Sequence, residues 1–352
     1  MSGKTASTLG SLLEILEDWR ARYARVFWIL HSIWALGMGL AVVLWAGERY
    51  HFLPWVGVFL VLVWLSTFVF TRWFRPGLEP ETLWKQGFIS YVTRVLYQET
   101  LFFLLPFYFY STTWPSWNMG FFLLLAAMAF FACLDLAFDR CLKRFRLFAA
   151  GYFSLVTFAA LNFLFPLLLR WQVHRSIRAA LALSLAAGLA LVVSASTFSQ
   201  PWRLAGAVLL LASAGWIADR LLPVVPPVPL RVLDLSFAGS FDPATFQSPV
   251  FFRDKIPRAE LRDGKLYVVA RVFAPVRLPV RAVFRFSADG VPVATSRVID
   301  VPAHRYGFRI WYAVALARLD AAGREGSAER TVRVEVWTDH GQLLGRSEVT
   351  LG

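Results

Sequence analysis

The chain has 352 residues, of which 57% are hydrophobic and 16% aromatic, and this is too apolar for an ordinary soluble protein of its length. The net charge of +13 is typical of nucleic-acid-binding proteins, but much of the excess Lys and Arg lies in short segments between apolar runs, as the positive-inside rule describes. Composition therefore makes a lipid bilayer, and not a nucleic acid, the expected surroundings of the chain.

Residues 1–25 predict a short amphipathic helix on the cytoplasmic side. Ser11 and Glu14 fit a capping box, and the acidic residues come before Arg20 and Arg25, which suits the helix dipole. Two positions for this helix remain open, one on the membrane surface and one packed against the helices that follow.

Seven apolar segments then predict a helical membrane domain over residues 26–222. Each segment is about 20 residues long, which is the length of a helix that crosses a bilayer. The segments are approximately 26–46, 52–71, 87–111, 117–138, 147–169, 179–198 and 202–222. Tryptophans gather near their ends, as in the aromatic belts of membrane proteins.

The distribution of basic residues predicts the orientation. More Lys and Arg residues fall on the side of the N-terminus than on the other side, and the loop 170–178 with its three arginines is the exception. We therefore expect a cytoplasmic N-terminus and, after seven spans, an extracytoplasmic C-terminal region. A count of six spans would reverse the side of the C-terminal region.

Residues 223–230 read Pro-Val-Val-Pro-Pro-Val-Pro-Leu and predict a linker. Proline cannot continue a helix and favours an extended polyproline rod of roughly 3.1 Å per residue. The expected linker is stiff and holds the following region up to roughly 20 Å from the bilayer.

Residues 231–352 predict an all-β antiparallel sandwich of immunoglobulin-like type. Apolar and polar residues alternate in short runs, and Asp289-Gly290 and His340-Gly341 supply hairpin turns. The runs are 231–237, 266–273, 281–286, 291–301, 308–316, 332–337 and 343–351. Seven short strands without a helical period are typical of such sandwiches, and a small barrel is the alternative.

The C-terminal half resembles a bacterial domain family of unknown function that ends multi-pass membrane proteins. The resemblance rests on Gly307-Phe308-Arg309-Ile310-Trp311, on the valine-rich run 330–336, and on Thr338-Asp339-His340-Gly341-Gln342-Leu343-Leu344-Gly345. It covers about 270–352, and the upstream part resembles the companion family of uncharacterised membrane proteins. The run 282–286 lacks the His-x-Trp pair that members of the family often carry. The resemblance implies a bacterial envelope protein and no particular substrate.

Polar residues within the apolar segments form one candidate site, because charges are costly in lipid. His31, Arg94 and Asp135 lie at a similar depth, and Asp139 is one helical turn from Asp135. Glu99 lies deeper. An Arg94–Asp135 ion pair near His31 is interpreted either as a proton relay or ligand site, or as a pair that fixes how the helices pack.

A second candidate site is a basic face of the β region. Alternation places arginines and tryptophans on the polar sides of neighbouring strands, namely Arg271, Arg281, Arg285, Arg309, Trp311 and Trp337. Anionic envelope polymers or lipid head groups are the ligands that such a face would take. The alternative is a solvated face whose charge is balanced by Asp and Glu.

No catalytic, cofactor-binding or metal-binding motif is recognisable in the sequence. The five histidines do not pair with Cys or carboxylates at metal-ligand spacing, so we predict no metal and no cofactor. The favoured hypothesis is a non-enzymatic inner-membrane anchor that presents a β-sandwich to an envelope protein or anionic polymer. The alternative is a transporter or intramembrane enzyme that uses the polar residues of the first, third and fourth spans.

Overall fold

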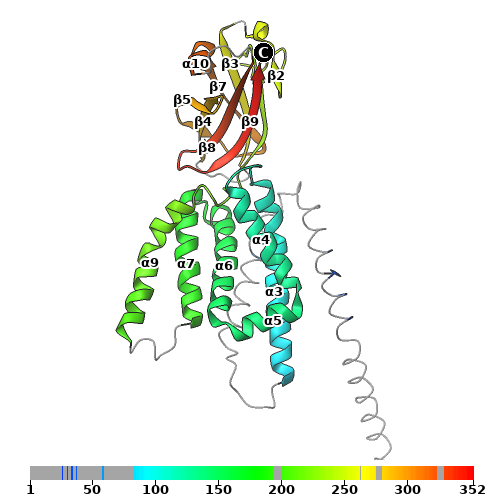
Figure 1. Ribbon diagram of the computed structural model, residues 1–352, viewed down its shortest axis with the longest axis vertical. Coiled ribbons are helices and arrows are strands. Elements are labelled where there is room, and N and C mark those ends of the chain that lie inside the picture. Colours follow the sequence, from blue (N-terminus) through cyan, green and yellow to red (C-terminus); the bar gives the residue numbers. More distant parts are fainter. Residues whose placement is uncertain are drawn as a thin grey trace, which may run out of the picture.

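A computed structural model describes residues 83–192, 200–261, 263–274, 280–322 and 329–352, with a few single positions between 26 and 58. Within this part, a helical region is followed by a β region that sits on one end of the helices (Figure 1). The predicted helix over 1–25, and the first two predicted spans apart from those single positions, lie outside the described residues.

Six long helices make up the described helical region. They are α3 (Leu83–Tyr110), α4 (Asn118–Cys133), α5 (Asp135–Arg144), α6 (Arg146–Leu169), α7 (Val173–Val192) and α9 (Pro201–Leu221). All but α5 run side by side, and α5 crosses the end of the bundle that is remote from the β region (Figure 1). By length and composition, α6 and α7 are two described helices that are long and apolar enough to cross a membrane.

The predicted span over 117–138 is broken near its end. Helix α4 stops at Cys133, and Leu134 leaves helical geometry with φ −84° and ψ 69° before α5 begins. The physical reason lies in the composition of α5, which is amphipathic: Phe138 is buried while Arg140 is exposed. Such a helix is suited to a surface position, and its continuation along the apolar path of α4 would bury its charges.

The predicted loop over 170–178 is wrong, because α7 begins at Val173 and not near residue 179. The helix can start in this basic stretch because one of its arginines is neutralised. Arg178 forms an ion pair with Asp219 of α9, with 2.7 Å between Nη2 and Oδ1. The two charges that interrupt the apolar pattern of α7 and α9 therefore compensate each other at the exposed side of the bundle.

Close backbone approach and polar contacts hold the helices together. A Cβ placed on Gly188 of α7 would meet the Ser154 hydroxyl of α6 at 1.8 Å and the Ala150 carbonyl oxygen at 3.2 Å. The Gln98 amide of α3 donates to the Ala132 carbonyl oxygen at 2.7 Å, and the Tyr152 hydroxyl of α6 donates to the Met128 carbonyl oxygen at 2.9 Å. Small residues and buried side-chain hydrogen bonds are the usual means by which helices associate in membranes.

The β region consists of two sheets. Its strands are β1 (Arg231–Ala238), β2 (Lys255–Ile256), β3 (Lys265–Ala274), β4 (Val280–Ala288), β5 (Val291–Thr295), β6 (Ile299–Val301), β7 (His304–Ala315), β8 (Arg330–Thr338) and β9 (Leu343–Leu351). One sheet has the order β1-β3-β7, and the other has the order β2-β9-β8-β4-β5 with β6 beside β4. The second sheet is mixed, because β2 runs parallel to β9.

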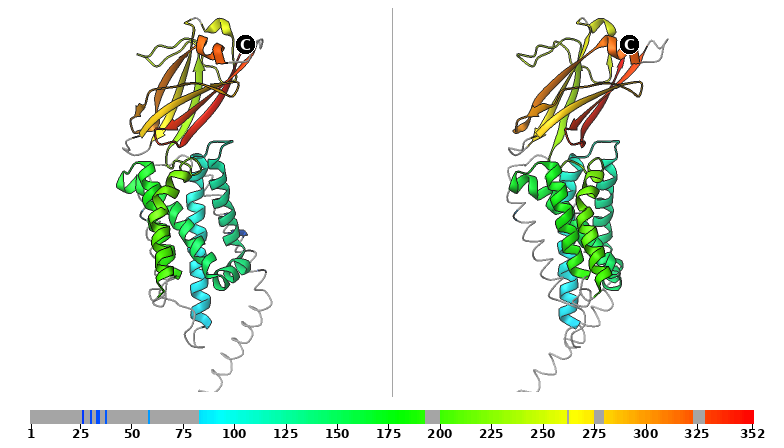
Figure 2. Two further views of the ribbon diagram at one scale, coloured as in Figure 1. Left: turned by 60° about the vertical axis from the view of Figure 1, so that its left-hand side comes forward. Right: turned by 90° about the vertical axis from the view of Figure 1, so that its left-hand side faces the viewer.

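The two sheets pack face to face (Figure 2). Strand alternation turns one side of each sheet inward, as in β8, where Val332, Val334 and Val336 are buried. Aromatic rings join the two layers: Phe286 of β4 lies 5.8 Å, centroid to centroid, from Tyr312 of β7. The region also contains a short helix, α10 (Leu316–Ala322), which the alternation of the sequence does not reveal.

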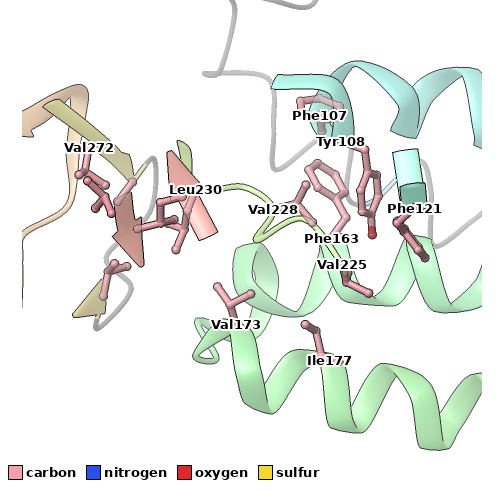
Figure 3. Close-up of a cluster of buried hydrophobic side chains, with 14 of the residues drawn as sticks. Phe107, Tyr108, Phe121, Phe163, Val173, Ile177, Val225, Val228, Leu230 and Val272 are labelled. Atoms are coloured by element: carbon pink, nitrogen blue, oxygen red, sulfur yellow. The ribbon is translucent and has the colours of Figure 1, made fainter. Parts of the chain in front are cut away.

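The proline segment is not the extended rod that its composition predicts. It turns on itself, since the Val225 amide donates to the Leu221 carbonyl oxygen (2.9 Å) and the Leu230 amide to that of Pro227 (2.7 Å). Residues 225–230 are all buried. Figure 3 shows Val225 and Val228 beside side chains of the helices, with Leu230 toward the sheets. Burial of the valines between two regions overrides the local preference of proline for an exposed rod.

Polar contacts surround this buried segment. Arg346 of β9 donates from Nη1 to the Pro115 carbonyl oxygen at 2.8 Å, before the start of α4. The Arg231 guanidinium lies 4.8 Å from the centre of the Tyr110 ring, at the end of α3. The β region is therefore seated on the helix ends, and we call these contacts, together with residues 225–230, the junction.

We expect the substitution Gly188→Val to lower the stability of the helical region by about 1–3 kcal/mol, because the added atoms meet backbone of α6. The measurement is thermal unfolding of the purified chain in detergent. Gly151→Val is the matched control, since a Cβ there has open space. Equal midpoints for the two variants would contradict close packing of α6 and α7.

We expect Val228→Ala to destabilise the chain by about 1–3 kcal/mol, because it removes buried methyl groups from the junction. The same change at the exposed Val291 should stay within about 0.5 kcal/mol. Chemical unfolding followed by tryptophan fluorescence measures both. A silent Val228 variant would restore the interpretation of the segment as an exposed spacer.

Candidate anion-binding site

A basic pocket of about 180 Å³ lies on the outer face of the three-stranded sheet. Strands β1, β3 and β7 and the loop after β1 supply its lining, which consists of Asp234, Ser236, Phe251, Arg253, Val269, Arg271 and Arg309. Three arginines face one aspartate, so the pocket carries a surplus of positive charge. We call it the arginine pocket.

The strand register brings the charged residues of the pocket together. Asp234 of β1 is the cross-strand partner of Arg271 in β3, and Arg271 is in turn the partner of Arg309 in β7. Directly opposite residues have side chains on the same face of a sheet. Two guanidinium groups placed side by side repel each other, and an anion between them would relieve that repulsion.

The carboxylate of the pocket is paired with one of the three arginines of the pocket. Asp234 Oδ1 lies 3.3 Å from Nη2 of Arg253, which reaches in from the loop after β1. In the part of the chain that the structure describes, no carboxylate lies within ion-pair distance of Arg271 or Arg309. Arg309 makes one long hydrogen bond, from Nη1 to the Phe246 carbonyl oxygen at 3.5 Å. The two guanidinium groups therefore retain donors for a ligand.

A glycine makes room for one of these arginines. Gly307 has φ +86°, and a Cβ at this position would lie 2.8 Å from Cγ of Arg271. The missing side chain lets the stem of Arg271 lie close against the backbone of β7. The glycine of the Gly-Phe-Arg-x-Trp run thus has a local role beside the pocket.

Aromatic side chains flank the arginine pocket. Trp311 packs with Phe241 at 5.5 Å and with Tyr267 at 6.4 Å between ring centres, so the tryptophan is partly covered by the loop after β1. Phe251 lines the pocket and is 41% exposed. It provides the exposed aromatic surface that the sequence pattern had assigned to Trp311.

Local hydrogen bonds shape the loop that carries Phe241. The Thr245 hydroxyl donates to Asp242 Oδ2 at 2.7 Å, and the Ala244 amide donates to Oδ1 at 2.9 Å. The pKa of Asp242 is lowered, chiefly by the Thr245 hydrogen bond. The turn is therefore fixed by an ionised aspartate, and it holds Phe241 against Trp311.

The other predicted members of the basic face lie on the second sheet. Arg281 forms an ion pair with Asp339, with 2.5 Å between Nη2 and Oδ2. The Arg285 guanidinium stacks over Trp337 at 4.6 Å from the ring centre. These three side chains do not reach the arginine pocket, because β4 and β8 belong to the opposite layer. The residues predicted to form one basic face therefore lie on two different sheets.

Sequence alternation missed Arg253 and Phe251. Both belong to the run Phe251-Phe252-Arg253, which lies in the connection between β1 and β2 and has no strand period of its own. In the structure, an isolated β-bridge between Phe252 and Phe237 holds this run beside β1. Such a contact follows from the tertiary fold and not from the local pattern.

The polar residues predicted within the helices are only partly brought together. Arg94 of α3 is 3% exposed and lies 3.4 Å from Asp139 of α5, measured from Nη1 to Oδ2. Asp139 is one turn farther along α5 than Asp135, whose side chain lies outside the described part, so the predicted Arg94–Asp135 pair stays a prediction. Glu99 is exposed on α3. His31 lies outside the described residues.

Within the described residues, no group of three or more His, Cys, Asp or Glu side chains is placed to hold a metal ion.

Comparison with known proteins places the chain in a family. No curated protein matches it. A family described as "Family of unknown function (DUF5924)" matches residues 9–268. The match includes all of the described helices up to α9 and continues into β3, and it ends before the strands on which the resemblance of the C-terminal half rests. Since it covers well over half of the sequence, the chain belongs to this family of unknown function, DUF5924.

Proposed function

We propose that this protein is a bacterial inner-membrane anchor that presents an immunoglobulin-like β-sandwich outside the cytoplasm, where the arginine pocket binds an anionic envelope polymer. The observation that carries the proposal is the side-by-side placement of Arg271 and Arg309 in a pocket whose one carboxylate, Asp234, pairs with Arg253. The proposed role is binding and not catalysis. No general base or nucleophile lines the pocket apart from Asp234 and Ser236, and Asp234 is already paired with Arg253.

The chemistry of arginine indicates the ligand class. A guanidinium group presents its N–H donors in a planar fork that matches the two oxygens of a carboxylate or phosphate. A pocket of about 180 Å³ has room for one such group with part of the chain that carries it. Phe251 at the rim adds apolar surface for that chain. We therefore propose the phosphate or carboxylate groups of a polymer as the ligand.

The strand order supports the immunoglobulin-like part of the proposal. In sequence order, β1, β3 and β7 take the positions of strands A, B and E in one sheet, and β9, β8, β4 and β5 take those of G, F, C and C′ in the other. Three features differ from that pattern: the short parallel strand β2 beside β9, the strand β6 beside β4, and the three described strands of the first sheet where the pattern has four.

The charge distribution supports an extracytoplasmic β region. Helix α3 ends and α4 begins at the β region, and the basic residues Arg140, Arg144 and Arg146 lie at the opposite end, around α5. The arginines of residues 170–178, which are the exception to the charge bias, lie at or just before the start of α7. The ion pair of Arg178 with Asp219 reduces the positive charge on that side. We propose seven spans in all, with a cytoplasmic N-terminus.

The polymer-binding proposal predicts that Arg271→Gln and Arg309→Gln each weaken binding about tenfold or more, because hydrogen bonds to charged groups contribute about 1.5–3 kcal/mol each. The measurement is calorimetric titration of the full chain, in nanodiscs of neutral lipid, with polyphosphate and separately with polygalacturonate. The preferred polymer shows whether phosphate or carboxylate is recognised.

Arg333→Gln is the matched control for that titration. It removes the same charge from an exposed position on the second sheet, where Arg333 pairs with Glu348. An equal loss of binding in this control, or no binding of either polymer by the unaltered chain, would refute the arginine pocket as the binding site.

The orientation predicts that a reporter enzyme active only outside the cytoplasm, fused after Gly352, is active in a bacterial host. The same reporter fused after Arg144, at the end of α5, should be inactive. Enzyme assays on intact cells that express each fusion at equal level make the comparison. An inactive reporter after Gly352 would place the β region in the cytoplasm.

A further inference from the structure

We propose that His174 and His340 form a pH-sensitive contact that loosens the β region from the helices when the surroundings become acidic. His174 is the second residue of α7, and His340 lies in the turn between β8 and β9. Their ring centres are 3.5 Å apart and the ring planes are tilted by 45°. The contact therefore joins the two regions directly, at the junction.

The contact lies in a small polar cavity of about 20 Å³. Its lining combines residues of both regions, namely Gln172, Val173, His174, Leu230, Val280, Arg281, Thr338, Asp339, His340 and Gln342. Gln342 is 1% exposed and donates to the Val225 carbonyl oxygen of the proline segment at 3.4 Å. Gln342 therefore links the cavity that the two imidazoles line to the buried segment 225–230.

Two buried polar atoms at this place have no hydrogen-bond partner within the structure, Nδ1 of His174 and Oε1 of Gln342. His174 is only partly exposed and holds one of these two atoms, whereas His340 is exposed. The cavity volume is enough for one water molecule. Two positive charges on rings only 3.5 Å apart repel each other, so the second proton is disfavoured while the rings stay in contact.

The charged groups around the rings are mostly positive. On α7 these are Arg175 and Arg178, and on β4 it is Arg281. Arg178 is compensated by Asp219 of α9. Among the described residues that line the cavity, Asp339 is the one carboxylate, and it lies 3.6 Å from His340 Nε2 while it also pairs with Arg281. One shared carboxylate can balance one protonated ring but not two.

The direction of the effect follows from proton linkage. If the seated form accepts one proton fewer than the separated form, acid favours separation. For a histidine with its ordinary value near 6.5 in the separated form, exclusion of one proton shifts the equilibrium toward separation by up to about 30-fold between pH 7.5 and pH 5.0.

The reactivity of a thiol placed in the junction measures the equilibrium between the seated form, in which the β region contacts the helices, and the separated form. In a background without Cys133 and Cys141, a thiol introduced by Val228→Cys is buried in the junction, whereas one introduced by Val291→Cys is exposed and reports the intrinsic reactivity at each pH. The probe is a small methanethiosulfonate reagent, applied to the full chain in nanodiscs of neutral lipid. The ratio of the two labelling rates is the protection factor, and we expect it to fall about 30-fold between pH 7.5 and pH 5.0.

Replacement of either ring by a side chain that cannot be protonated should remove the response. With His174→Gln or His340→Gln, we expect the protection factor to change less than about threefold over the same range. His304→Gln is the matched control, since this exposed histidine of β7 lies outside the cavity lining and should leave the full response intact.

A permanent charge provides a further test. His340→Lys supplies permanently the one charge that Asp339 can balance, so we expect protection at pH 7.5 and a full fall toward pH 5.0 as His174 is protonated. An unaltered chain whose protection does not depend on pH would overturn the proposal, as would a 30-fold response that survives in both Gln variants. These readouts do not involve the arginine pocket, so they stand or fall independently of polymer binding.

Discussion

The architecture depends on the burial of residues 225–230 between the helix ends and the two sheets. Proline removes the amide hydrogens that a helix or a sheet would need, so this segment can be buried at little cost in unpaired donors. Its valines and leucine supply the apolar surface that both neighbours require. The same six residues, which lie between the end of α9 and the start of β1, therefore also fix where the first strand begins.

Because this segment is buried, the helical region and the β region hold a fixed position relative to each other. A β region tethered by an exposed rod would sample many orientations relative to the membrane. Here, Arg231 against Tyr110, Arg346 against Pro115 and the imidazole pair fix three separate points around the buried segment. The arginine pocket accordingly has a defined place relative to the helices. Asp234 is three residues beyond the junction along β1, which corresponds to roughly 10 Å in a strand.

Much of this fold follows from the sequence, and the exceptions share a cause. The long uncharged run over 147–169 could only be a helix, and the alternation in β8 could only be a two-sided strand, because local pattern and burial agree there. The early start of α7 depends on Asp219, a partner elsewhere in the chain, and the buried course of residues 225–230 depends on both neighbouring regions. Arg271 and Arg309 were recognisable from alternation, whereas Arg253 and Phe251 reach the site from an irregular loop.

The contacts of β9 with the helices have a consequence for the order of folding. Arg346 meets Pro115 across 231 positions of sequence, and Asn118 meets Leu343 across 225. Contacts so distant in sequence form late, because the intervening chain must already be folded for the loop to close at tolerable entropy. The helices must be assembled and the β8–β9 hairpin must be complete before the contacts of the junction can form. Formation of the junction therefore shows that both the helical region and the β region have folded.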